Sequence, residues 1–365
     1  MKKKIVGDRL LFFIPILILI VISLFNMYYV SMMDGYENYL FKQALWFVLG
    51  FVVLILFYIF KPKIFFRYSA YLYWINVLLL ILVLFFGTTI NGSRAWFRLP
   101  FFSFQPSELM KFSLALYLSH ILAKIKSKNM KEEFKVILKA LFITLIPSLF
   151  VFLEPDTGAI IIYFLIMIGI ILVYKINFKW YILLGIVLFL FFGTFFYLYY
   201  FHQDLLINLI GTSFFYRVDR ILTFVNQDSF QLNRALISIG SANFFAYSNG
   251  VYIPEAPTDF IVAFSISKLG IISFVLILLC FFILDIYFLI KVFKIKNKQY
   301  KMFIAGFLTM FIFAQIENIG MNLGLLPIIG LPLPFVSYGG TNIIVYFMFL
   351  GILVNIERKA FVNKM

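Results

Sequence analysis

Ionisable side chains at the borders of long apolar segments are the residues of this chain that can do chemistry. Asp259 in YIPEAPTDFIVAF stands where a polar stretch meets an apolar one, with Glu255 four residues before it. A carboxylate at such a border is partly dehydrated, which raises its pKa toward the range of a general base. Asp259 is therefore the best catalytic candidate, and a purely structural helix N-cap is the alternative.

Cationic side chains form a second set of candidates. Arg94, Trp96 and Arg98 in NGSRAWFRLP combine two guanidinium groups with an aromatic ring, which suits a phosphate or the face of a sugar. An interfacial aromatic anchor with arginines that bind lipid headgroups explains the same spacing equally well. Glu108 and Lys111 in FQPSELMKF share one helix face, directly after a proline that suits a helix start. They can contact a charged substrate or form a structural ion pair.

Other polar residues are expected to have structural roles. Asp156 in LEPDTGAI follows a proline at a predicted helix entrance, where a carboxylate makes a good N-cap. NIGMNLGLLPIIGLPLPFVSYGGTNII is rich in glycine and proline between two apolar segments, so it should form a broken, re-entrant segment that lines a cavity. The residues of this region with an expected structural role are Glu317, Asn318, Ser337, Gly339 and Gly340.

Patterns for metal ions or disulfides are missing from the sequence. His120 and His202 have no partners at ligand spacing, and no HExxH, zinc or glycine-rich phosphate motif occurs. Cys280, the single cysteine, lies inside an apolar run and is expected to be a small buried hydrophobe. We therefore expect no built-in metal site.

The elements that carry these residues are predicted to be membrane-spanning helices. Hydrophobic residues make up 64% of the 365 positions and charged residues 13%, and the mean hydropathy is +1.02, outside the range of soluble domains. Apolar segments without polar alternation can cross a membrane only as helices. The expected fold is a single all-α membrane domain over 1–365 with about ten spanning helices. The predicted spans are 10–32, 41–60, 64–87, 104–123, 136–153, 157–174, 179–201, 259–290, 301–323 and 334–356.

The positions of the charges predict the orientation. With the N-terminus inside, the cytoplasmic segments hold 23 Lys and Arg and the outer loops hold 6. This asymmetry favours cytoplasmic N- and C-termini, and it accounts for the net charge of +15 without a nucleic-acid partner. The largest loop, 202–258 between the seventh and eighth helices, is then extracytoplasmic, as are 88–103, 154–156 and 324–337. YRVDRILTFVNQ in the largest loop suits an amphipathic segment on the membrane surface.

Six motifs follow one another along the chain: NGSRAWFRL, FSFQPSELMKF, LEPDTG, QLNRALISIGS, PEAPTDFIVAF and NIGMNLGLLPIIGLPLPFVSYGGTN. Their order and separations resemble the SEDS family of membrane proteins, FtsW, RodA and SpoVE, which polymerise peptidoglycan. The resemblance covers nearly the whole chain. FSFQPSEL, LEPD and PEAxTDF favour FtsW, whereas NIGM is more typical of RodA.

The resemblance implies a glycosyltransferase of the bacterial inner membrane that uses lipid II in cell division or cell-shape maintenance. Asp259 would deprotonate the acceptor hydroxyl, which attacks the anomeric carbon of the donor, inverts it to a β-1,4 link and releases undecaprenyl pyrophosphate. Because pyrophosphate is already a good leaving group, the paired carboxyl groups of glycoside hydrolysis are not required.

The resemblance also implies ligands and partners. Trp96 would contact a sugar, and the residues that would neutralise the pyrophosphate are Arg94, Arg98 and Lys111, with Arg217 or Arg220. A loosely held divalent cation, Mg²⁺ or Mn²⁺, would assist without a dedicated cage. A class B penicillin-binding protein, the transpeptidase that cross-links the glycan in a division or elongation complex, would contact the helices laterally.

Three positions depart from the family pattern. Pro257 stands where the family has the His of an HTDF stretch, and Ser267 and Lys268 stand where two acidic residues are common. These changes leave open a specialised or less active paralogue, but Asp259 remains and we expect an enzyme. The alternatives are a flippase for lipid II or another polar lipid, and a noncatalytic scaffold for a transpeptidase.

Overall fold

The described part of the chain contains ten helices of 18 or more residues. The computed structural model describes residues 2–33, 35–90, 93–98, 103–126, 129–212, 230–245 and 252–362. Within these ranges the helices of 18 or more residues are α1 (Lys2–Val30), α2 (Tyr39–Ile59), α4 (Ser69–Phe86), α5 (Pro106–Lys124), α6 (Met130–Leu153), α7 (Thr157–Tyr174), α8 (Phe178–Phe201), α13 (Ile271–Lys294), α14 (Lys298–Asn322) and α15 (Gly340–Val362). The shorter helices are α3 (Pro62–Arg67), α9 (Gln203–Ile210), α11 (Phe230–Gly240) and α12 (Ile261–Leu269).

The length and composition of the helices confirm the predicted fold class. In the described part of the chain, eight of them are long and apolar enough to cross a membrane, all but α5 and α8 of the long set. α5 carries a buried charged pair, Glu108 and Lys111, near its start. α8 has 24 residues, and its first part, Phe178–Val187, is apolar. The protein is an all-α polytopic membrane protein.

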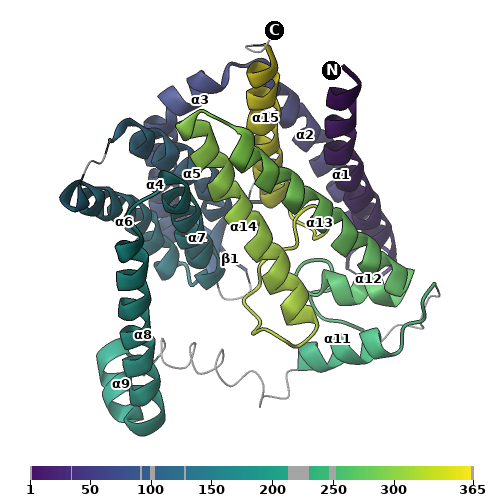
Figure 1. Cartoon of the computed structure of the whole chain (residues 1–365). Helices are drawn as coiled ribbons and strands as arrows, with labels where there is room; N and C mark the ends of the chain where they lie inside the picture. Colours follow the sequence, from purple (N-terminus) through teal and green to yellow (C-terminus); the bar gives the residue numbers. More distant parts are fainter. Residues whose placement is uncertain are drawn as a thin grey trace.

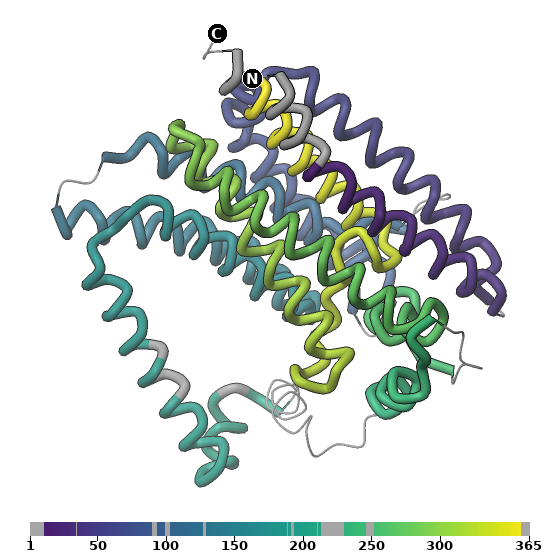
Figure 2. Tube along the Cα trace, turned by 45° about the vertical axis from the view of Figure 1, so that its right-hand side comes forward, coloured from purple at the N-terminus to yellow at the C-terminus, as the bar shows by residue number. Residues whose placement is uncertain are grey.

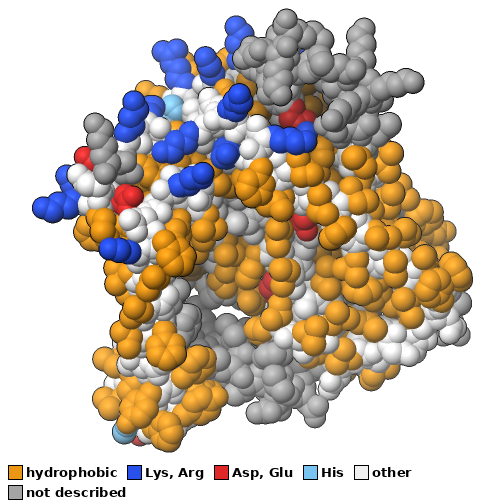
Figure 3. All heavy atoms as spheres, in the orientation of Figure 1, with side chains coloured by type: hydrophobic (Ala, Val, Ile, Leu, Met, Phe, Trp, Pro, Cys, Tyr) orange, Lys and Arg blue, Asp and Glu red, His pale blue; other side chains and the backbone are white. Residues whose placement is uncertain are grey.

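The two ends of the bundle differ in charge. Both chain termini lie at one end, beside α3, while α11 and α12 lie at the other (Figure 1). Lys and Arg side chains gather over the end that carries the termini (Figure 3). This distribution agrees with the charge asymmetry from which we predict cytoplasmic termini.

The core of the bundle is built by close helix pairs. α2 packs along α15, and α14 packs along α7 while also touching α5, α12 and α13. Figure 2 shows α14 running through the bundle, whereas α8 and α9 extend away from it. A side chain at Gly50 of α2 would come within 2.4 Å of the fully buried Phe347 ring of α15. Glycine is therefore what allows these two helices to approach so closely.

One predicted helix is wrong. The apolar segment 259–290 is not continuous, because Gly270 breaks it into α12 and α13 with a φ of 82°. A Cβ at Gly270 would lie 2.5 Å from the Phe244 carbonyl oxygen, so only glycine fits there. The amides of Ile271 and Ile272, at the start of α13, donate to the carbonyls of Asn243 and Phe244 at 3.2 Å each. The apolar composition of the segment does not show this break.

The predicted loop 88–103 contains a small antiparallel sheet. Its strands β1 (Thr88–Ile90), β2 (Ser93–Arg98) and β3 (Ser103–Phe104) follow in the order β1-β2-β3. Thr88 pairs with Trp96, and Phe97 pairs with Phe104. Threonine and aromatic residues favour strands, so a membrane-border loop of this composition can form a hairpin that covers helix ends.

We predict that Gly50→Ala destabilises the fold. The new methyl group would overlap the Phe347 ring, which is buried on all sides and cannot move away freely. Overpacking of this kind costs about 1–3 kcal/mol. Thermal unfolding of the purified protein in detergent measures the effect. The control is Gly185→Ala in α8, where no atom lies within 4 Å of the added Cβ; equal melting temperatures of the two variants would refute the packing argument.

Candidate active site around Asp259

A tight turn fixes the backbone of Asp259. The Glu255 carbonyl oxygen accepts hydrogen bonds from the amides of Thr258, Asp259 and Phe260 at 3.2, 3.1 and 3.1 Å. Glu255 itself has a left-handed φ of 53°, a conformation that costs a non-glycine residue free energy and that clusters at functional sites. α12 starts at Ile261 with Phe260 as its N-cap and without a side-chain capping bond. Asp259 is therefore not the N-cap of α12.

Two asparagines of α14 hold the turn from the other side. Asn318 Nδ2 donates to the Asp259 carbonyl oxygen at 3.0 Å and to the Leu331 carbonyl oxygen at 2.8 Å. Asn322, one helical turn later, donates to the same Asp259 oxygen at 2.9 Å and accepts from the Ala263 amide at 2.9 Å. Both asparagines are fully buried. α14 therefore ties Asp259 to the first turn of α12.

The glycine- and proline-rich segment between α14 and α15 forms the third side of the site. It contains no helix or strand over 323–339, in line with the expected broken segment. Ser337 Oγ donates to the Thr258 carbonyl oxygen at 2.6 Å, and the Tyr338 amide donates to the Pro257 carbonyl oxygen at 2.8 Å. Pro257 thus contributes its backbone to the site, although it lacks the side chain of the histidine that the family pattern has.

Two glycines mark the start of α15: Gly339 precedes the helix and Gly340 is its first residue. A Cβ at Gly340 would lie 2.1 Å from the Trp46 ring of α2, so glycine lets α15 start directly against α2. Gly339 has only an ordinary contact, 3.7 Å from its Cβ position to Asn342. Of this pair, Gly340 is the position that packing restricts.

The carboxyl group of Asp259 lies in a dehydrated setting. The side chain is only partly exposed. Burial raises the pKa of Asp259 to about 6, and the negative charge of Glu255 adds to the effect. Gly330, with a φ of 81°, faces the carboxylate, since a Cβ there would lie 3.5 Å from Asp259 Oδ2. A carboxylate in this range can accept a proton at neutral pH and release it again.

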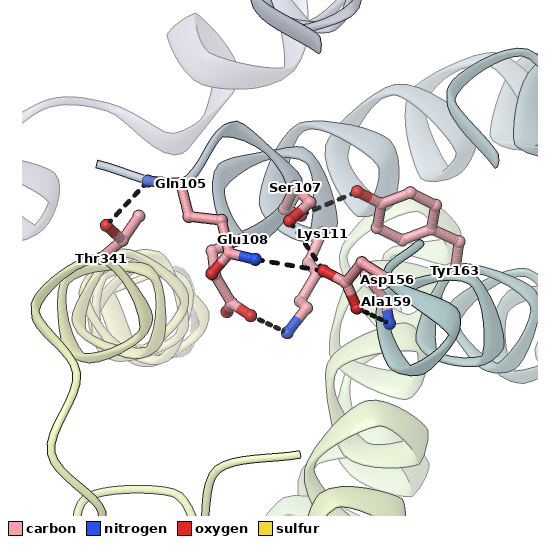
Figure 4. Close-up of polar contacts among 8 residues, drawn as sticks. All are labelled: Gln105, Ser107, Glu108, Lys111, Asp156, Ala159, Tyr163 and Thr341. Atoms are coloured by element: carbon pink, nitrogen blue, oxygen red, sulfur yellow. Dashed lines mark hydrogen bonds and ion pairs between the residues drawn. The ribbon is translucent and has the colours of Figure 1, made fainter. Parts of the chain in front are cut away.

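Glu108 and Lys111 form a buried ion pair on α5. Lys111 Nζ lies 2.6 Å from Glu108 Oε1, and the residues are 4% and 6% exposed. Figure 4 shows the two side chains pointing toward each other. The other Glu108 oxygen, Oε2, has no hydrogen-bond partner in the described part of the chain. The pair is electrically neutral as a unit, so it contributes little net charge to a bound anion.

Asp156 caps α7 and ties it to α5 (Figure 4). Its Oδ1 accepts from the Ala159 amide at 3.0 Å, the geometry of an N-cap. Its Oδ2 accepts from Gln105 Nε2 at 3.1 Å and from Ser107 Oγ at 3.2 Å. The side chain thus has partners on both oxygens and a structural role.

The cationic candidates lie on the sheet rather than beside Asp259. Arg94 and Arg98 are exposed on β2, and Arg94 Nη1 donates to the Leu84 carbonyl oxygen at 3.3 Å. Trp96, on the same strand, is partly buried, and β2 packs against α4 and α5. None of the contacts described for these three side chains involves Asp259. Arg217 and Arg220 lie outside the described residues.

Sequence reasoning missed several polar residues. Asn322 was not among the predicted site residues, although it follows Asn318 at a spacing of four, on the same helix face. Glu154 is fully buried at the end of α6, where burial and the charge of Asp156 raise its pKa to about 8. Its burial depends on how the sheet covers α6, since Ser93 Oγ donates to the Glu154 carbonyl oxygen. No local sequence signal indicates that contact.

The described residues do not fit a dedicated metal site. No group of three or more His, Cys, Asp or Glu side chains that could hold a metal ion occurs among them. We therefore derive no catalytic step through a metal ion.

Comparisons with known proteins agree with the predicted family. The FtsW, RodA and SpoVE family model, described as "Cell cycle protein", matches residues 8–361. A probable peptidoglycan glycosyltransferase FtsW of Wigglesworthia glossinidia brevipalpis is 32% identical over 100% of this chain and 97% of its own. Peptidoglycan glycosyltransferase MrdB of Helicobacter pylori is 27% identical over 86% and 82%.

Solved structures share the fold. A chain from a structure titled "Structural coordination of polymerization and crosslinking by a peptidoglycan synthase complex" has a TM-score of 0.80 and 23% identity over 96% of this chain and 97% of its own. The crystal structure of the rod shape determining protein RodA of Thermus thermophilus has a TM-score of 0.69 and 24% identity over 96% of each chain. With the family model covering nearly the whole sequence, this chain belongs to the FtsW/RodA/SpoVE family of cell cycle proteins.

Proposed function

We propose that this protein is a peptidoglycan glycosyltransferase that polymerises lipid II. The observation that carries the proposal is the setting of Asp259, a partly exposed, dehydrated carboxylate whose backbone is fixed from α14 and from its own turn. α12, which Asp259 precedes, lies at the end of the bundle away from the termini (Figure 1). The curated relatives that are named peptidoglycan glycosyltransferases support the same reaction class.

In the proposed reaction Asp259 acts as the general base. It takes the proton of the acceptor sugar hydroxyl as the hydroxyl oxygen forms a bond to the anomeric carbon of the donor. The bond from that carbon to the pyrophosphate oxygen breaks, and the undecaprenyl pyrophosphate leaves with the electron pair. Inversion at the carbon gives a β-1,4 link. A fixed backbone supports this role, because a general base must lie within hydrogen-bond reach of the proton it removes.

Arg94 and Arg98 are the proposed partners of the pyrophosphate. Both are exposed on β2, whereas the charge of Lys111 is already matched by Glu108. Trp96, between the two arginines, would contact a sugar. A loosely held Mg²⁺ or Mn²⁺ would be bound mainly by phosphate oxygens, in keeping with oxygen-rich ligand sets of such ions. Figure 3 shows a hollow between the α8 side and the rest of the molecule.

We also propose a partner, a class B penicillin-binding protein that acts as the transpeptidase. The related solved chain belongs to a complex that coordinates polymerization and crosslinking. A groove of about 730 Å³ between α13 and α14 offers a surface for a partner helix. Its lining is apolar except for Asp285 and Gln315, whose Nε2 donates to Asp285 Oδ1 at 3.1 Å. Polar groups at membrane depth are costly, and they commonly hydrogen-bond to a neighbouring helix.

A lipid flippase and a noncatalytic scaffold are the alternatives. A flippase would need the cationic side chains but no general base, and a scaffold would need only its partner-facing helices. The polymerase is favoured because two other chain segments, α14 and 323–339, hydrogen-bond to the turn that carries this carboxylate.

We predict that Asp259→Asn abolishes polymerisation. Loss of a general base lowers turnover by about 10²- to 10⁴-fold. Purified protein in liposomes with lipid II is assayed for glycan strands on gels, without a partner transglycosylase. The matched control is Asp204→Asn, an exposed carboxylate on α9 that should leave activity unchanged.

Other outcomes would favour the alternatives. Movement of labelled lipid across vesicles without polymer, equal in both variants, would indicate a flippase. Full complementation of a depletion strain by Asp259→Asn would indicate a scaffold.

We predict that Asp259→Asn also makes the protein more stable at high pH. Because folding raises the pKa of this carboxyl from 3.8 to about 6, ionisation costs more in the folded state than in the unfolded state. The cost is absent below about pH 4, grows between about pH 4 and 6, and is constant above. A gain of about 2 kcal/mol is expected at pH 8, since each pKa unit corresponds to about 1.4 kcal/mol and the side chain keeps some hydration. Thermal unfolding of both proteins at pH 4 and pH 8 measures it; a pH-independent difference would contradict the burial of this charge.

We predict that Leu279→Trp weakens binding of the partner transpeptidase. Leu279 is 52% exposed and lines the groove between α13 and α14, so an indole there would fill the space that a partner helix needs. Co-purification of the two proteins after expression in one membrane should fall at least about tenfold, the effect of losing about 1.4 kcal/mol. Leu183→Trp on α8, 48% exposed, is the control and should co-purify like the wild type. Equal co-purification of both variants would exclude the groove.

A further inference from the structure

A second carboxyl group, Glu317 of α14, lies beside the Asp259 site. Glu317 is 1% exposed, and its Oε1 accepts a hydrogen bond from the Ile329 amide at 3.2 Å. Its other oxygen, Oε2, is buried without a hydrogen-bond partner among the described residues. Asn318, the next residue, is one of the two asparagines that donate to the Asp259 carbonyl oxygen. Glu317 is thus part of the same wall of the site but has no role in the reaction as written above.

One turn of the chain connects the two carboxyl groups. The Ile329 amide is hydrogen-bonded to Glu317. The next residue, Gly330, faces Asp259, since a Cβ added at Gly330 would lie 3.5 Å from Asp259 Oδ2. The loop that closes the site therefore lies between the two carboxyl groups and touches both.

Two negative charges on either side of one short loop are unfavourable in a dehydrated site. Like charges that share a site resist joint ionisation, and a buried carboxylate oxygen without a donor loses its hydration without compensation. Asp259 is the partly exposed member of the pair, and Glu317 is the enclosed one. The arrangement favours a charged Asp259 next to a neutral Glu317, which still accepts the Ile329 amide through Oε1.

We propose that Glu317 is a positioning residue that must keep its proton while Asp259 is ionised. Neutral Glu317 holds the 329–331 loop against Asp259 and adds no second negative charge where an anionic pyrophosphate arrives. When Glu317 loses its proton, two negative charges face each other across Gly330. The anionic pyrophosphate of the glycosyl donor is then repelled. The inference rests on the proposed polymerase function and assigns the alkaline limb of its pH profile to Glu317.

Other charged groups on the neighbouring elements are engaged elsewhere. Glu255 acts on Asp259 from its own turn, and Asp285 of α13 accepts from Gln315. Lys111 of α5 is paired with Glu108, and Lys268 of α12 lies over the Phe264 ring with Nζ 5.9 Å from its centroid. Asp259 is the carboxyl group that lies across the 329–330 loop from Glu317.

The test compares Glu317→Gln with Glu317→Leu over about pH 5 to 10. Wild-type polymerisation should give a bell-shaped profile, with activity falling about tenfold per pH unit beyond its alkaline limb. Glutamine imitates the neutral acid and keeps the Ile329 hydrogen bond, so Glu317→Gln should stay within about threefold of wild type at neutral pH and lose the alkaline limb. Leucine cannot accept from Ile329, so Glu317→Leu should lower activity at every pH.

Two results would overturn the proposal. One is an alkaline limb that persists unchanged in Glu317→Gln, since the limb would then belong to another group. The other comes from infrared difference spectra of the full-length protein in detergent, which need no activity. The carbonyl stretch of protonated carboxyl groups that disappears on raising the pH should be weaker in Glu317→Gln than in wild type, because buried Glu154, whose pKa is also raised, contributes to the band in both proteins. If the two proteins lose the same band intensity, the proposal fails, whereas failure of polymerisation with the expected difference present refutes only the proposed function.

Discussion

A carboxylate can stay at the border of an apolar bundle only where the backbone around it is fully hydrogen-bonded. Asn318 and Asn322 meet this condition, because both donate to the Asp259 carbonyl oxygen while they also hold the Leu331 carbonyl and the Ala263 amide. Buried amide side chains that lose a partner leave unsatisfied groups, each costing about 1–3 kcal/mol. The position of Asp259, the start of α12 and the course of the loop before α15 all depend on these bonds.

The same constraint explains why irregular backbone occurs where it does. Chain without regular structure is tolerated near a membrane only if it is buried in protein and its polar groups find partners. The segment 323–339 finds them in the Asp259 turn, through Ser337 and Tyr338, and the start of α13 finds them in Asn243 and Phe244. Irregular segments are thus collected at one end of the bundle, and each supports another. This arrangement gives the candidate site around Asp259 its fixed backbone.

Charge separates the two ends in a second way. Lys and Arg side chains cover the end with the termini (Figure 3), whereas the opposite end carries the carboxyl groups of Asp259 and Glu255. Arg94 and Arg98 are exceptions on the sheet, exposed and without a carboxylate partner among their described contacts. Under the proposed function, an anionic lipid-linked substrate would meet few other positive charges there, so these two arginines would have a larger share in binding it.

Much of this protein could be predicted from its sequence, because membrane helices are fixed by long apolar runs and the bilayer leaves no other backbone structure possible. The all-α class and the broken segment after α14 follow from local composition, and the family follows from the ordered motifs; the catalytic role of Asp259 stays a prediction. The break at Gly270 could not be predicted, since it depends on the close approach of Phe244. The three-stranded sheet between Thr88 and Phe104 could not be predicted either, because the composition of that loop is mixed. Asn322, Glu154 and the position of Glu317 beside Asp259 depend on contacts between distant segments. Sequence therefore determined which residues border the membrane, and only tertiary packing decided which of them meet, because hydrogen bonds and like-charge contacts between separate segments exist only after the helices have packed.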